Sequence, residues 1–306
     1  MTKFRGITCI LVTILSVQGV VHAVDLDKLK KFEEKLKKYS RPAQSEQAAP
    51  ANATPPANPV AAPPEADLPR IPPVGNVPEA DEVKIGRYVA GNLLGAAPLV
   101  NDDALQSYVN RVGRWVALAS ERPDLKWTFG VIESKAVNAF AAPGGYVFLT
   151  RGLYGLLRDE AELAGVLGHE IGHVVRRHHL KVMQKTQALG VGSDLIRKRL
   201  GDNKIARSLV GTGAEIMARG LDRDAEFEAD RIGVVLASRA GYDPYGLPSV
   251  LQEISHISGA DSSVALLFKT HPHPDERLAR LGEAMGSRFD AMTDGKNLEQ
   301  RLVSAR

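Results

Sequence analysis

The chain has 306 residues, of which 44% are hydrophobic and 25% charged, and these proportions are typical of a globular protein with a sizeable core. Its formal net charge of +3 gives no indication of nucleic-acid binding, and a single cysteine, Cys9, excludes an internal disulfide. Only 6% of the residues are aromatic, which favours aliphatic, helix-rich packing.

The first 23 residues have the features of a secretory signal peptide. Lys3 and Arg5 precede an apolar stretch, residues 6–21, and small residues around Ala23 form a plausible cleavage site. The apolar stretch is shorter than the roughly 20 residues of a membrane-spanning helix, so a retained anchor is the less favoured alternative. We therefore expect residues 1–23 to direct export, to the periplasm or a similar space, and the remaining chain to have no transmembrane span.

Two segments with different compositions follow the signal. Residues 24–40 predict a short amphipathic helix, because apolar residues recur at helical spacing from Leu26 to Leu36. This helix either contacts a partner or membrane surface, or is a solvated charged helix. Residues 41–78 hold 11 of the 18 prolines and few core-forming residues, which predicts a disordered linker.

The folded domain is expected to span residues 79–290, followed by a C-terminal tail, residues 291–306. Apolar residues three and four apart predict two helices at its start, and alternating apolar residues then predict two strands. In chain order, the helices are 79–96 and 102–121 and the strands 126–134 and 144–150. Most of the later sequence has the period of a helix, and Asp159 with Glu162 forms a capping box at the start of one such helix.

Two histidines and a glutamate occur on that helix in the pattern His-Glu-x-x-His. Because residues four apart lie one turn apart on one helical face, His169 and His173 can bind a single zinc ion as neutral imidazoles. Glu170 lies beside this face and can take a proton from water as the water attacks a carbonyl. Apolar neighbours and two small residues, Gly168 and Gly172, favour this interpretation over two partly buried structural histidines.

A catalytic zinc ion needs a third protein ligand from another segment. Residues 221–233 offer Glu226 and Asp230, four apart on one helical face. Glu226 can complete the ligand set for one zinc ion per chain, and Asp230 can accept the outer N–H of a ligating histidine. We interpret Glu228, which points away from Glu226, as a solvated charge. Taken alone, this acidic group is more typical of a surface cluster paired with arginines.

Four segments occur in the same order as in metallopeptidase family 48, namely NAFAAPGGYVFLTRGL, HEIGH, EFEAD and HPHPDER. From about residue 79 to 286 the chain resembles this family. The resemblance implies an α+β fold, a mostly helical zincin domain of the gluzincin type with a small β-sheet beside the active-site helix. Some members carry transmembrane helices or C-terminal helical repeats, which we do not find here. The residues that match the family's zinc ligands, general base and following acid are His169, His173, Glu226, Glu170 and Asp230.

The resemblance also implies a substrate-binding segment. Asn138, Ala139 and Phe140 match residues that line the cleft near the metal in this family. The strand that follows, around Tyr146–Thr150, is expected to be an edge strand that pairs with an extended peptide through main-chain hydrogen bonds.

A further histidine, His271, matches a family residue that can approach the metal. There it either stabilises the developing oxyanion or occupies the position of the water and silences the enzyme. A helix-capping role is the simpler alternative for His271. Arg277, in the same motif, and His178, on the far side of the extrapolated helix, are interpreted as structural.

The sequence thus predicts a zinc-dependent metalloendopeptidase, a hydrolase that cleaves unfolded or misassembled envelope proteins in protein quality control. The alternative is a metal-containing chaperone or assembly factor whose site is self-inhibited and largely non-catalytic. The N-terminal arm, residues 24–40, is a candidate for docking on an envelope protein complex. Residues 184–220, rich in glycine and basic residues, are predicted to form a lid over the cleft.

Overall fold

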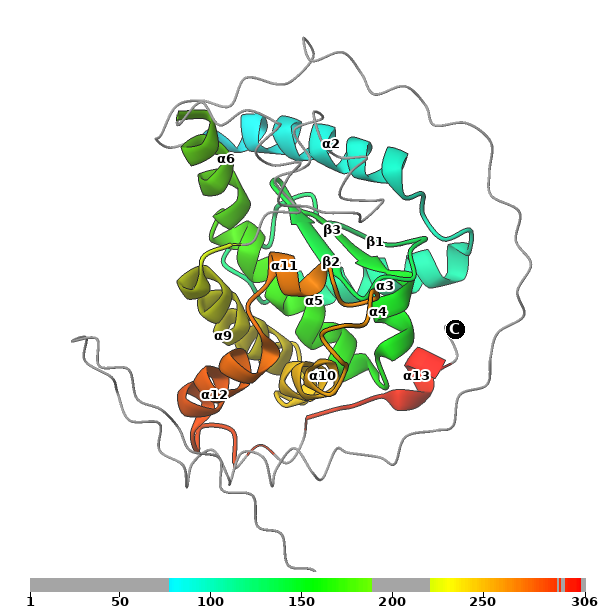
Figure 1. The fold of residues 1–306 in the computed structure, drawn as a ribbon, viewed down its shortest axis with the longest axis vertical. Coiled ribbons are helices and arrows are strands. Elements are labelled where there is room, and N and C mark those ends of the chain that lie inside the picture. Colours follow the sequence, from blue (N-terminus) through cyan, green and yellow to red (C-terminus); the bar gives the residue numbers. More distant parts are fainter. Residues whose placement is uncertain (1–76, 189–220, 291, 293–294, 304–306) are drawn as a thin grey trace, which may run out of the picture.

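The computed structural model describes residues 77–188, 221–290, 292 and 295–303 (Figure 1). The predicted signal peptide, the amphipathic helix, the linker up to residue 76 and the lid from residue 189 to 220 lie outside the described residues. Among the residues described, no helix is both long enough and apolar enough to span a bilayer.

The described chain is mostly helical, with one small sheet, which confirms the α+β fold class. The predicted helix over residues 79–96 coincides with α2, and the predicted strands contain β1 and β3. In chain order, the elements are α2 (Glu79–Ala96), α3 (Asp103–Ala117), β1 (Thr128–Ile132), β2 (Ala139–Ala142), β3 (Tyr146–Thr150), α4 (Arg151–Leu156), α5 (Glu160–Val175), α6 (His178–Ala188), α9 (Arg223–Arg239), α10 (Gly246–Ser255), α11 (Leu267–Thr270), α12 (Pro274–Met285) and α13 (Glu299–Val303).

The three-stranded sheet has the order β1-β3-β2. β3 pairs with β1 in parallel and with β2 in antiparallel fashion, Phe148 lying opposite Phe140. The prediction that β3 is an edge strand is therefore wrong. The sheet edge nearer to α5 is β2, which reverses into β3 through Gly144 and Gly145, both at positive φ (75° and 97°) where glycine is favoured.

The sheet separates two hydrophobic clusters. Alternate side chains of β3 enter different clusters, because successive residues of a strand point to opposite faces. Val147 and Leu149 pack with α3 and α5, whereas Phe148 packs with α2. Figure 1 shows the sheet between α2 and α5 accordingly. The domain thus consists of α2, the sheet, and a helical layer built around α5.

The central helix of that layer, α5, is buried along almost its whole length. Asp159 caps it, since its side chain accepts a hydrogen bond from the Glu162 backbone N–H at 2.8 Å. Glu162 does not bond back to Asp159 as in a complete capping box; it accepts from the backbone N–H and the guanidinium of Arg158. Asp159 therefore caps the helix at the position predicted from the sequence, but Glu162 bonds to Arg158 in place of Asp159.

The first turn of α5 is held by a buried carboxylate that three distant segments share. Glu160 accepts hydrogen bonds from the hydroxyls of Tyr108 (2.7 Å) and Tyr242 (2.8 Å), and Arg301 of α13 forms an ion pair with it at 3.1 Å. Its backbone N–H donates to Asn297 O. Asn297 and Arg301, which lie in the C-terminal tail predicted from the sequence, thus contact the helix that carries the histidine pair.

α5 makes its most extensive helix contact with α9, and glycines lie at the point of closest approach. A Cβ atom built on Gly168 would lie 2.8 Å from Gly233 O, and one built on Gly233 would lie 2.8 Å from His169 N. Side chains larger than hydrogen at these positions would push the helices apart. The glycines that make α5 a poor helix by propensity are explained by the approach of α9.

We predict that Gly233→Ala lowers both stability and metal affinity, because the added methyl group overpacks the α5–α9 contact. The expected loss is about 1–3 kcal/mol in the free energy of unfolding, measured by urea titration in the presence of chelator. Gly91→Ala in α2 is the matched control, since its Cβ would meet nothing within 4 Å. That control should be neutral or stabilising by up to about 1 kcal/mol. Equal effects of both substitutions would contradict the close-contact explanation.

Candidate metal centre

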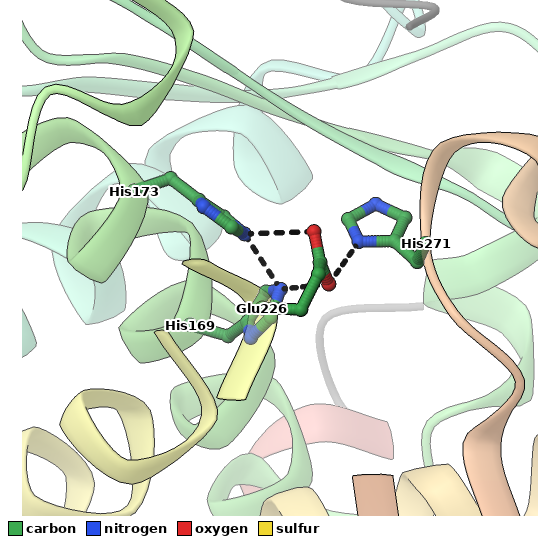
Figure 2. A group of neighbouring side chains, drawn as sticks. All are labelled: His169, His173, Glu226 and His271. Atoms are coloured by element: carbon green, nitrogen blue, oxygen red, sulfur yellow. Dashed lines mark hydrogen bonds and ion pairs between the residues drawn. The ribbon is translucent and has the colours of Figure 1, made fainter. Parts of the chain in front are cut away.

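The two histidines of α5 and a glutamate of α9 converge on one point. His169 Nε2 and His173 Nε2 are 3.0 Å apart. Glu226 Oε2 lies 3.7 Å from His169 Nε2, and Glu226 Oε1 lies 3.6 Å from His173 Nε2. Figure 2 shows the imidazoles and the carboxylate directed toward one another. All three side chains are buried.

This spacing fits a single metal ion. Tetrahedral coordination with metal–nitrogen and metal–oxygen bonds of about 2.0–2.2 Å places donor atoms about 3.3 Å apart, close to the separations observed here. In addition, Glu226 Oε1 is buried and has no hydrogen-bond partner among the described residues. Burial alone would raise the pKa of Glu226, but the neighbouring His271 and Arg277 hold that pKa below its usual value. The ionised form that a cation requires is therefore favoured.

The outer nitrogen of His169 is held by Asp230, as the sequence spacing suggested. Asp230 Oδ1 lies 2.9 Å from His169 Nδ1. Arg277 in turn binds Asp230 with two hydrogen bonds, Nε to Oδ2 at 3.0 Å and Nη2 to Oδ1 at 2.6 Å. Burial alone would raise the pKa of Asp230, but Arg277 holds that pKa far below its usual range. Asp230 is thus an ionised acceptor that orients Nε2 of His169 toward the ligand point.

The outer nitrogen of His173 is held by His178, which in turn contacts Glu228; the sequence alone indicates only a structural role for His178 and a solvated charge at Glu228. His173 Nδ1 and His178 Nδ1 are 3.0 Å apart, and His178 Nε2 lies 3.2 Å from Glu228 Oε2. Burial lowers the pKa of both imidazoles, so both are neutral. His173 Nδ1–H can then donate to His178, and His178 Nε2–H can donate to Glu228, which leaves Nε2 of His173 free for a metal.

His178 was misplaced because the sequence was extrapolated as one continuous helix. Instead, α5 ends at Val175, and Arg177 has a positive φ of 57° before α6 begins at His178. This break turns His178 back toward His173. No glycine or proline announces the break, so the signal available in the sequence was only the second histidine pair, His178 and His179. His179 lies beside His173, with ring centroids 5.7 Å apart, but outside the converging group.

A fourth side chain, His271, joins the converging group. It directly follows α11, and its Nδ1 lies 2.7 Å from Glu226 Oε2. Ligand atoms of His169, His173, Glu226 and His271 all lie within 4.8 Å of one another. The structure therefore brings His271 against the carboxylate of the metal-binding group, from the side opposite to the two histidines of α5 (Figure 2).

Glu170 is adjacent to this group without being part of it. Its side chain is buried, and its electrostatic neighbours include His169, His271 and Glu226. Burial raises the pKa of the Glu170 carboxyl, and the nearby His169 and His271 oppose that effect. A carboxylate with a raised pKa is a stronger base than an ordinary glutamate and is suited to proton transfer.

The segment predicted to bind substrate lies at the sheet edge. Asn138 immediately precedes β2; it is fully buried, and neither polar atom of its amide has a hydrogen-bond partner among the described residues. Ala139 faces the α5 side of the sheet, whereas the Phe140 side chain is buried against the α2 cluster. Phe140 is therefore available to a ligand only through its main chain. The end of β2 lines a narrow crevice together with His173 and His179.

Two histidines and a glutamate contributed by two helices, with a buried glutamate beside the first histidine, define a metallopeptidase-type site of the zincin class. The family model described as peptidase family M48 matches residues 103–285, more than half of the chain. The chain belongs to this family of metalloproteases. The matched region contains the sheet, both helices of the converging group and His271.

Several relatives carry names that fit this family. The beta-barrel assembly-enhancing proteases of Yersinia pestis and Escherichia coli are each 32% identical to the chain, over 65% of its length and 42% of theirs. The mitochondrial metalloendopeptidase OMA1 of Schizosaccharomyces pombe is 31% identical over 58% of the chain and 52% of the relative. The chain thus spans less than half the length of the beta-barrel assembly-enhancing proteases that it matches.

We predict that His178→Ala weakens metal binding by about 10- to 100-fold, because His173 loses the acceptor that fixes its tautomer and orientation. Competition with a chromogenic chelator measures this affinity. His178→Gln, which restores an acceptor, should recover part of the loss, and exposed His256→Ala should leave the affinity unchanged. An unaltered affinity in a folded His178→Ala variant would rule out the orienting role.

Proposed function

We propose that the protein is a zinc-dependent endopeptidase that hydrolyses peptide bonds of unfolded or misassembled envelope proteins. The observation that carries the proposal is the convergence of His169, His173 and Glu226 within 3.7 Å of one another, with Glu170 buried alongside. Zinc is the metal that this donor set favours, since two imidazoles and one carboxylate are a common catalytic zinc set. One ion would be held per chain.

Bound zinc would supply a Lewis acid that polarises the scissile carbonyl and makes water an effective nucleophile near neutral pH. The protein's own contribution is proton transfer and orientation. Glu170 accepts a proton from the attacking water and then donates it to the nitrogen of the departing amine. Asp230 and His178 hold the two imidazoles in the required tautomer through their outer nitrogens.

The β2 edge of the sheet, beside which no further strand of the described chain lies, is the proposed substrate site. An extended peptide can add to β2 through main-chain hydrogen bonds, and the end of this strand borders the same crevice as His173. The amide of Asn138, which has no hydrogen-bond partner among the described residues, can donate to and accept from a peptide main chain beside it. Strand addition selects extended chains, which supports unfolded polypeptide as the substrate class.

The cellular setting of this activity rests on the sequence and on the relatives. Residues 1–23 support export, and relatives named beta-barrel assembly-enhancing protease support an envelope substrate. We propose a periplasmic location and a role in protein quality control. Docking on an envelope complex through the arm, residues 24–40, stays a prediction, because the arm lies outside the described residues.

We predict that Glu170→Gln retains metal but loses cleavage of an unfolded substrate such as casein. The loss should be at least about 10²-fold in kcat, because the amide cannot take up a proton. Metal content measured beside cleavage separates the two effects, and chelator should abolish the wild-type activity. Substantial cleavage by a metal-loaded Glu170→Gln variant would remove the proposed mechanism.

A second candidate function is a chaperone or assembly factor with a self-inhibited site. The contact of His271 with Glu226 at 2.7 Å favours it, because this histidine already lies within the metal-binding group. In that position His271 competes with water and with substrate for the free side of the site. The endopeptidase and the chaperone or assembly factor then differ in whether removal of the His271 side chain increases peptide cleavage.

We predict that His271→Ala raises cleavage of an unfolded substrate several-fold, because the contact with the ligand carboxylate is an inhibiting one. Steady-state cleavage at equal metal loading measures the effect. A fall of about 10²-fold or more in kcat would instead assign His271 to oxyanion stabilisation. Absence of cleavage both before and after the substitution would favour the chaperone or assembly factor.

A further inference from the structure

A second concave site lies away from the metal centre, between α3, the loop before β1 and α13. It is a groove of about 620 Å³, and none of its lining residues belongs to the metal-binding group. Both tryptophans of the chain, Trp115 and Trp127, line it. We propose that this groove binds an acidic segment of a partner protein, which packs an apolar side chain against Trp115 and Leu118 and places carboxylates on Arg111 and Arg114.

The apolar part of the groove is exposed and held in place. Trp115 is 55% exposed and Leu118 is 60% exposed, the two highest values among the exposed large hydrophobic residues of the described chain. The Trp115 indole N–H donates to Ala240 O at 2.9 Å, and the Trp127 indole N–H donates to Arg122 O at 2.9 Å. Both indole N–H groups are satisfied within the protein, so both rings are fixed. Trp127 is only 5% exposed and belongs to the core, so the apolar surface of the groove comes from Trp115 and Leu118. A fixed ring lowers the entropic cost of binding.

All the charged residues of the described chain that line the groove are arginines. Arg111 and Arg114 lie three residues apart on α3, both exposed, and neither forms an ion pair with a described residue. Arg301 is half exposed even though it contacts the buried Glu160. Among the described residues that line the groove, none is an aspartate or glutamate.

Exposed arginines elsewhere in the described chain include both paired and unpaired side chains. Arg223 forms an ion pair with Glu276 at 2.9 Å, whereas Arg87 and Arg288 form none with a described residue. The groove is distinguished by two arginines without an ion pair in the described chain, Arg111 and Arg114, beside the exposed Trp115 and Leu118. Guanidinium groups bind carboxylates through paired hydrogen bonds, and clusters of tryptophan, tyrosine and arginine are typical of protein-binding hot spots.

This chemistry selects a protein segment rather than a small anion or a purely apolar ligand. An apolar anchor alone would not use the arginines, and a phosphate alone would not use the exposed Trp115 and Leu118. The site would hold a partner or adaptor while the metal centre remains open to substrate. The inference does not depend on the proposed peptidase mechanism, because it rests on residues of a different surface.

The test uses the full chain with Glu170→Gln, so that peptide probes are not cleaved. A synthetic peptide in which aspartate and glutamate alternate with leucine and phenylalanine is titrated, and tryptophan fluorescence reports binding. A second peptide has lysine in place of every acid. We expect saturable binding of the acidic peptide alone, weakened at least about tenfold by the paired substitutions Arg111→Glu and Arg114→Glu.

The control carries the same charge change elsewhere. Arg87→Glu with Arg288→Glu alters two exposed arginines outside the groove and should change the affinity by less than about twofold. Trp115→Ala should weaken binding while circular dichroism shows an intact fold. Equal weakening by both charge-reversed pairs, equal binding of the lysine peptide, or groove-dependent binding of anionic vesicles or an oligonucleotide in place of the acidic peptide would overturn the proposal.

Discussion

The close crossing of α5 and α9 is the constraint on which the metal centre depends. Donor atoms can share one ion only if they lie within about 3–4 Å of one another. Side chains on two different helices come this near to each other only when the helix backbones nearly touch. Gly168 and Gly233 allow this approach. Glu226 and Asp230 lie on the turns of α9 that precede Gly233, so the crossing places both of them against the histidines.

A layer of buried charge surrounds this crossing and would be costly in isolation. Asp230 and Arg277 are both almost completely buried, and each is tolerated because the other neutralises it through two hydrogen bonds. Removing one partner would leave an uncompensated charge in the core. The buried carboxylates in turn fix the orientation of imidazoles that could otherwise rotate or change tautomer. The rigid geometry of the metal centre therefore depends on charged groups that are buried in the core.

Much of the centre follows from spacing in the sequence, because helical geometry is regular. His169 with His173, and Glu226 with Asp230, are both four residues apart, and in each case the shared face was predictable. The order of the strands in the sheet was harder to predict from the sequence. β2 consists of Ala139, Phe140, Ala141 and Ala142, which lack the β-branched residues that mark strands, so the true edge strand was not recognised. The position of His178 was also missed, since the break at Arg177 depends on tertiary contacts: Arg177 forms an ion pair with the buried Glu82.

The shared carboxylate at the start of α5 has a consequence for the order in which the molecule can assemble. Glu160 is bound from α3, from the segment after α9 and from α13, so its neighbours are separated by most of the domain sequence. A growing polypeptide in which residue 301 has not yet emerged would hold this carboxylate with part of its shell missing. The helix bearing the histidine pair would then reach its final setting only after residue 301 is available to fold. The setting of α5 therefore depends on contacts between segments far apart in the sequence, which form late because long loops must close first.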